Sequence, residues 1–144
     1  MKSIFKIRTA ISLAMCMALA MVCLTGCDKD DGPGGDTRDG YTGTYKVTSE
    51  RVGTIGTDVD YNITITKSSA NTVDILISNI INLGAGYTIV ATVNGDSFTI
   101  PQQTVVGVGF SGSGRRNGNS ISFSVQVTET GYATVNFSVD AVRL

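Results

Sequence analysis

The most regular feature of this chain is an alternation of apolar and polar residues that runs from Tyr41 almost to the C-terminus. Alternation at period two places successive side chains on opposite faces of a β-strand, whereas an amphipathic helix needs apolar residues three or four positions apart. In the segment 59–66, four apolar residues alternate with four polar ones. The pattern therefore predicts an all-β domain over residues 41–144.

Eight segments carry the alternation and are predicted to be strands. They are 44–50, 59–66, 72–79, 87–93, 97–100, 105–112, 120–128 and 132–142. Asn94-Gly95 falls between the fourth and fifth segments, and this dipeptide is typical of a type I′ hairpin turn because both residues must adopt positive φ. Pro101 has no amide donor, so we expect it to end the fifth strand or to lie on a sheet edge. The turn between the sixth and seventh strands is expected at residues 115–118.

Short connections between successive strands favour antiparallel neighbours in meander order. Eight such strands can close into an up-and-down barrel that leaves no free edge. A Greek-key β-sandwich is the alternative. A transmembrane barrel is disfavoured, because its strands need about 9–11 residues and aromatic girdles, whereas most of these strands are shorter and their aromatic residues are scattered.

The N-terminus has a different character. After the basic residues Lys2, Lys6 and Arg8, an apolar run of about 15 residues, 10–24, fits a secretory signal peptide better than a membrane span. The run ends in Leu24-Thr25-Gly26-Cys27, which resembles the lipobox of bacterial lipoproteins. The resemblance implies a signal peptide over 1–26 and a diacylglycerol on Cys27, which would hold the chain on a membrane almost permanently. A signal peptide cleaved elsewhere is the alternative.

The residues after the cysteine resemble sorting signals. Lys29-Asp30-Asp31 resembles the export signal that sends lipoproteins of some Gram-negative anaerobes to the cell surface, while Asp28 resembles an inner-membrane retention signal of other groups. We expect a lipid-anchored outer-membrane protein at the cell surface, with a periplasm-facing position as the alternative. Residues 27–40 offer little apolar side chain to bury and predict a flexible linker.

The composition limits the chemistry. The chain has no histidine, which removes the usual general base and every histidine metal site. Without Lys2, Lys6 and Arg8, eight basic residues remain against twelve acidic ones, a net charge of −4 that argues against a nucleic-acid partner.

Two motifs were weighed as sites and rejected. Residues 107–112 spell G-x-G-x-x-G, but a dinucleotide fingerprint needs a following helix, and here a hairpin is expected, so we expect the glycines to allow a bulge or close backbone approach. Asp58 and Asp60 share a strand face without the spaced oxygen ligands of a cation loop. We expect no catalytic residues, metal or cofactor, and no enzyme activity.

The start and end of the domain carry a family resemblance. Gly43-Thr44-Tyr45 resembles the Gly-x-Trp element that opens lipocalins and the wider calycin group, with tyrosine in place of tryptophan, and Arg143 occupies the place of their C-terminal basic residue. The domain is similar to the small lipocalin-like domains of bacterial lipoproteins. The resemblance implies that Arg143 packs across the ring of Tyr45 and closes the barrel floor, a cation–π contact of about 0.5–2 kcal/mol.

The expected function is that of a lipid-anchored cell-envelope binding protein, which holds a small apolar or amphipathic ligand or a protein partner. A structural or adhesive surface subunit without a small ligand is the alternative. A barrel filled by Phe98, Phe110, Phe123 and Phe137 would favour the second, and an interior void of a few hundred Å³ would favour the first.

Overall fold

The computed structural model describes residues 35–144. The signal peptide predicted over 1–26, the acylated Cys27 and the sorting signal Lys29, Asp30 and Asp31 all lie outside the described residues. These features therefore stay predictions.

Nine antiparallel strands form one sheet in which sequence neighbours are spatial neighbours, apart from a short added hairpin strand. The strands are β1 (Gly43–Val52), β2 (Ile55–Thr57), β3 (Asn62–Lys67), β4 (Asp74–Ser78), β5 (Thr88–Asn94), β6 (Ser97–Val105), β7 (Val108–Asn117), β8 (Ser120–Glu129) and β9 (Val135–Arg143). Two short 3-10 helices, η1 (Thr37–Gly40) and η2 (Ile80–Asn82), complete the described chain.

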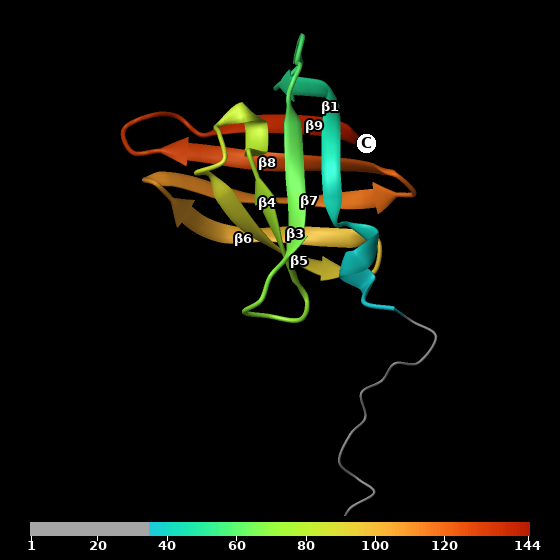
Figure 1. The fold of residues 1–144 in the computed structure, drawn as a ribbon. Helices are drawn as coiled ribbons and strands as arrows, with labels where there is room; N and C mark the ends of the chain where they lie inside the picture. Colours follow the sequence, from blue (N-terminus) through green and yellow to red (C-terminus); the bar gives the residue numbers. More distant parts are fainter. Residues whose placement is uncertain (1–34) are drawn as a thin grey trace, which may run out of the picture. The chain divides into compact units, whose positions relative to one another are not determined.

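The sheet closes on itself because β1 pairs with β3 along one edge and with β9 along the other. The eight strands β1 and β3–β9 thus form a closed antiparallel barrel in meander order, and the sequence prediction of an eight-stranded up-and-down barrel is confirmed. Figure 1 shows β7–β9 running across the view and β1 and β3 running from top to bottom. The Greek-key sandwich is not formed, because its two separate sheets would leave free edges.

The inward positions of the strands fill the barrel with apolar side chains. Tyr45, Ile63, Ile77, Ile89 and Phe98 are among the residues with almost no solvent exposure. They belong to one continuous hydrophobic cluster, to which every strand of the barrel contributes. The interior of the barrel is therefore a packed core rather than an empty cavity.

Several predicted boundaries move, each for a local reason. The sixth strand was predicted from residue 105 but begins at Val108, because Val106 and Gly107 both have positive φ, 50° and 79°, and form the turn. Arg115 and Arg116 were predicted in a turn but lie within β7, and the chain reverses at Gly118 instead.

Pro101 does not end its strand, because β6 continues to Val105. β6 pairs with β5 only near the hairpin, through Thr99, and its register with β7 shifts between Ile100 and Gln103. Pro101 thus lies where β6 has already separated from β5. This is a local edge position, where the missing amide donor of proline costs no strand hydrogen bond.

The folded unit begins earlier than composition suggested. It spans Asp36–Leu144, whereas the linker was expected to reach residue 40. Thr37–Gly40 form η1, and Arg38 is buried. This unit contains the whole closed sheet and the whole core, so a chain from residue 35 onward includes every element of the described fold.

Candidate functional site

One end of the barrel is sealed by the segment that precedes β1. Asp36 caps η1 by accepting a hydrogen bond from the Arg38 amide, 3.0 Å, and it also pairs with the Arg38 guanidinium. That guanidinium donates to the carbonyl oxygens of Ser68 and Asn71 at 3.1 and 2.9 Å. A buried cation is tolerated here because its donors are occupied, and it ties η1 to the β3–β4 loop.

The same end carries an exposed acidic and basic cluster. Lys67 contacts Asp36 at 3.0 Å and Asp39 at 2.5 Å. The hydrogen bond from Arg38 holds the pKa of the Asp36 carboxyl well below its usual range. The charges of Arg38 and Lys67 are balanced by those of Asp36 and Asp39. The cluster therefore stabilises the packing of η1 and is not a ligand site.

Two stacked arginine–tyrosine pairs lie at the same end of the barrel. Tyr41 is fully buried, donates to the carbonyl of Gly95 at 3.0 Å and meets Phe98 edge-on, with 5.9 Å between ring centroids. Arg116 lies over the Tyr41 ring, with its Cζ 5.4 Å from the centroid, and is held by Asp96.

The second pair is the one implied by the lipocalin resemblance. The structure brings Tyr45 and Arg143 together: Cζ of Arg143 lies 5.3 Å from the centroid of the Tyr45 ring. Arg143 Nη2 also donates to the Tyr45 hydroxyl at 2.9 Å and to the carbonyl of Gly40. The Tyr45 hydroxyl in turn donates to the carbonyl of Tyr41 at 2.9 Å. Both tyrosines are thus floor elements with satisfied polar groups.

The opposite end of the barrel, which we call the open end, carries exposed and half-buried apolar side chains, and the buried Ile80 and Ile81 of η2 also pack there. Six half-buried apolar residues pack on the upper margin of the core, and five of the eight exposed large apolar residues of the described chain lie in the loops and strand ends around them. We call these eleven residues the apolar rim: Ile55, Val59, Leu83, Tyr87, Val105, Val106, Val108, Val127, Tyr132, Val135 and Phe137. Single exposed apolar residues are ordinary, whereas a contiguous group marks an interaction surface.

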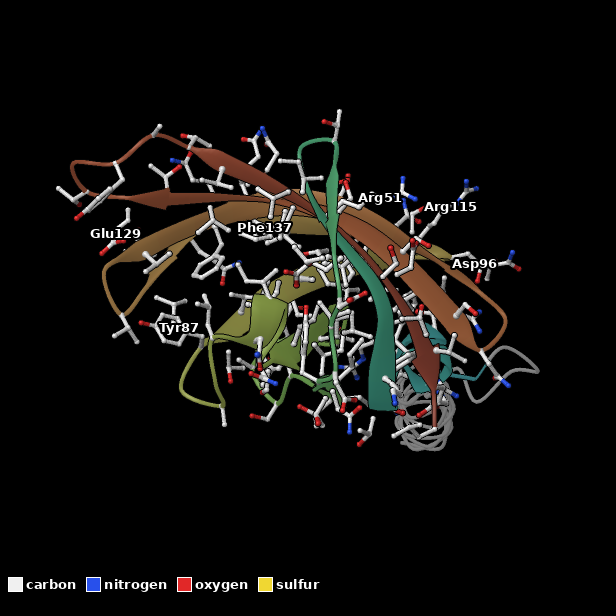
Figure 2. The ribbon with its side chains drawn as sticks, turned by 90° about the horizontal axis from the view of Figure 1, so that it is seen from above. Arg51, Tyr87, Asp96, Arg115, Glu129 and Phe137 are labelled. Carbon is white, nitrogen blue, oxygen red and sulfur yellow. The ribbon has the colours of Figure 1, made fainter. Side chains whose placement is uncertain are left out.

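Figure 2 shows how two members of the rim are presented. Tyr87 and Phe137 face the concave side of the arched β6–β9 sheet, while Arg115 and Asp96 project from the outer side. Tyr87 precedes β5 and Phe137 lies on β9, so the two side chains come from opposite walls of the barrel. The rim therefore surrounds the mouth rather than covering one flank.

A β-bulge turns one carboxylate into this open half. Val47 pairs with Ala141, but Ser49 pairs with Asp140, so Thr48 is an extra residue in β1. Strict alternation from Val47 would point Glu50 outward. Because of the bulge, Glu50 lies opposite buried Val139 and shares its inner face.

The Glu50 carboxylate has a single hydrogen-bond partner among the described residues. The Tyr61 hydroxyl donates to Glu50 Oε2 at 2.5 Å. Tyr61 is 8% exposed, and burial, together with the hydrogen bond to the carboxylate, raises the pKa of its phenol well above the ordinary value. The hydroxyl therefore stays protonated and keeps donating at physiological pH.

The barrel wall is also parted near the rim, between β5 and β6. The side-chain amide of Gln103 bridges the gap: its Oε1 accepts from the Val90 amide at 2.9 Å and its Nε2 donates to the Val90 carbonyl at 2.8 Å. A side chain here replaces a strand partner. The backbone groups of Val90 are thereby hydrogen-bonded although no residue of β6 pairs with Val90.

The measured depressions lie elsewhere, on the outer face of β6–β9. One of them has a volume of about 520 Å³. It is lined mainly by short polar side chains whose strand neighbours form the core, with Arg115 and Asp140 at its margins. Asp140 accepts from Ser122 at 2.6 Å. The lining of this depression is therefore rich in hydroxyl groups, and its charged residues are Arg115 and Asp140.

The remaining sequence candidates do not converge. Asp58 and Asp60 are exposed, with Lys46 3.4 Å from Asp60, and residues 35–144 contain no group of three or more potential metal-binding side chains. The G-x-G-x-x-G run forms a turn and part of β7, where a Cβ on Gly112 would lie 2.1 Å from the carbonyl oxygen of Ser124. That glycine serves close backbone approach, as expected.

Three functional features escaped sequence reasoning. Arg38 fell in the predicted linker, Gln103 fell between two predicted strands, and Glu50 had an outward position by strict alternation, which the bulge reverses. The sequence holds no signal for Glu50, because the bulge that re-aims its side chain is visible only in the pairing of β1 with β9.

Comparison of the sequence with known proteins assigns the chain to no family. No protein-family model matches the chain, and no curated protein matches it significantly. Within the described residues, no helix has both the length and the hydropathy needed to cross a bilayer.

Proposed function

We propose that this protein is a lipid-anchored cell-envelope binding protein whose barrel takes an apolar or amphipathic molecule, or an apolar part of a protein partner, at its open end. The observation that carries the proposal is the uneven distribution of exposed apolar surface. The apolar rim, with five of the eight exposed large apolar residues of the described chain, lies at the open end, whereas the sealed end is closed by buried Tyr41 and Tyr45 under Arg116 and Arg143.

The mode of binding follows from the packing. Core side chains fill the interior of the barrel. The ligand therefore lies on the apolar rim and between its side chains instead of entering a deep cavity. The lipocalin-like resemblance supports this use of a barrel end, since the eight-stranded meander and the contact between Tyr45 and Arg143 agree with it.

The proposed anchor is consistent with this arrangement. The lipobox-like sequence at Cys27 and the acidic signal Lys29-Asp30-Asp31 support an acylated protein at the outer membrane, facing the cell exterior. Asp36, where the folded unit starts, lies at the sealed end. The described chain thus enters the folded unit at the end opposite the apolar rim.

A non-catalytic role agrees with the same features. No reaction is assigned, because the chain lacks histidine and the Arg38 guanidinium at the sealed end is engaged in internal hydrogen bonds. The filled interior favours a second candidate, a structural or adhesive subunit that uses its outer face and takes no small ligand.

A probe experiment separates the two candidates. N-phenyl-1-naphthylamine, whose fluorescence rises in apolar surroundings, is titrated into the fragment 35–144. We expect saturable binding that Val135→Asp, on the inner face at the rim, weakens at least tenfold. Val142→Asp is the matched control, since this valine is similarly exposed and lies on the same strand, outside the rim. No saturable binding, or equal loss in both variants, would favour the structural subunit.

A further inference from the structure

The carboxylate of Glu50 is unusual for its location. It points to the inner face of β1, beside buried Val139 and two residues from Val52, which pairs with Phe137 of the apolar rim. Apolar surroundings disfavour an ionised carboxylate unless a cation or enough hydrogen-bond donors accompany it.

Glu50 lacks such compensation within the described residues. None of the ion pairs found in residues 35–144 includes it, and its polar contact there is the Tyr61 hydroxyl. That hydroxyl uses one lone pair of one carboxylate oxygen, so most of the acceptor capacity of the carboxylate is left over.

The backbone is built to place this group inside. Without the extra residue Thr48, the alternation of β1 would put Glu50 on the outer face, where water would solvate it. A bulge costs ladder hydrogen bonds and is typical of positions where a strand re-aims a side chain next to a site. Tyr61 then fixes the carboxylate in one orientation.

From this geometry we propose that the open end is specific for amphipathic cations: molecules with a protonated amine or another cationic head, which pairs with Glu50, and an apolar body, which lies against Phe137 and the rest of the apolar rim. This inference rests on the proposed function and specifies the chemistry of its ligand. Charge complementarity selects the head group, and burial of the apolar body supplies most of the affinity. An anionic amphiphile is excluded because its head would meet Glu50.

The test compares ligands that differ only in the head group. Octylammonium, 1-octanol and octanoate are titrated at pH 7 into ¹⁵N-labelled fragment 35–144, and amide chemical shifts report affinity and location. We expect octylammonium to bind about tenfold more tightly than 1-octanol, which corresponds to one charge-assisted hydrogen bond of about 1.4 kcal/mol, and octanoate to bind most weakly. Shifts are expected around Glu50, Tyr61 and Phe137.

Variants assign the preference to its residue. Glu50→Gln keeps an acceptor for the Tyr61 hydroxyl and should remove the preference for octylammonium over 1-octanol while 1-octanol affinity stays unchanged. Glu129→Gln is the matched control, because it makes the same charge change at an exposed strand end on the same side of the barrel. Tyr61→Phe should reduce the preference without abolishing it.

The outcomes are distinguishable. If none of the three ligands binds, the proposed function itself is overturned. If all three bind with equal affinity, or if Glu50→Gln and Glu129→Gln act alike, the open end binds apolar chains without cation selection and this inference is overturned alone. Binding of methylammonium as strong as that of octylammonium, or shifts centred on Asp36 and Asp39, would show surface ion pairing and would also overturn it.

Discussion

Replacement of Gln103 by alanine tests the most unexpected element of the barrel wall. Its side-chain amide makes two hydrogen bonds with the backbone of Val90, 2.9 and 2.8 Å long, at the place where β5 and β6 have parted. In Gln103→Ala both hydrogen bonds are lost. No residue of β6 pairs with Val90, so no backbone group of β6 replaces them. The adjacent Gln102 is exposed and is the natural control.

The magnitude follows from the two contacts. A neutral intramolecular hydrogen bond contributes about 1 kcal/mol net, and more when a buried partner is left unpaired. Val90 is half-buried, so water reaches its freed groups in part. We therefore expect Gln103→Ala to lower the free energy of unfolding by about 2 kcal/mol, and Gln102→Ala by less than about 0.5 kcal/mol.

Urea unfolding followed by far-ultraviolet circular dichroism measures this difference. The melting temperature should fall by about 6–12 °C in Gln103→Ala. Hydrogen exchange gives a local measure, since the amide of Val90 should exchange much faster in Gln103→Ala alone. Equal stability of the two alanine variants, with unchanged exchange at Val90, would show that the side chain does not substitute for a strand partner.

Three further predictions concern the sealed end and the anchor. Because its partner Arg38 holds the pKa of Asp36 below the unfolded value of 3.8, this carboxylate contributes stability above about pH 4 that is lost as the pH falls further; unfolding curves between pH 2 and 7 should show that loss, and Asp36→Asn should flatten it. Arg143→Met removes the stack on Tyr45 and should cost about 1–2 kcal/mol in urea unfolding, whereas an unchanged midpoint would exclude a closing role for the pair. Cys27→Ser should abolish labelling by an alkyne-bearing palmitate in cells, and persistence of the label would place the lipid elsewhere.

Much of the barrel is a local property of the sequence. Alternation at period two fixes which side of a strand is apolar, and a dipeptide such as Asn94-Gly95 fixes a tight turn, so the strands and the meander order could be predicted. The boundary errors are local as well: Val106 adopts a φ of 50° that β-branched residues seldom take, and only the surrounding strands could impose it.

The closure of the sheet and the character of its two ends were decided by tertiary structure alone. Barrel and sandwich share one strand pattern, and the pairing of β1 with β9, between residues almost 100 positions apart, selects the barrel. The same long-range pairing contains the bulge that turns Glu50 inward. Sequence periodicity assigns faces to strands, but the position of a side chain relative to distant strands depends on register, which no local pattern encodes.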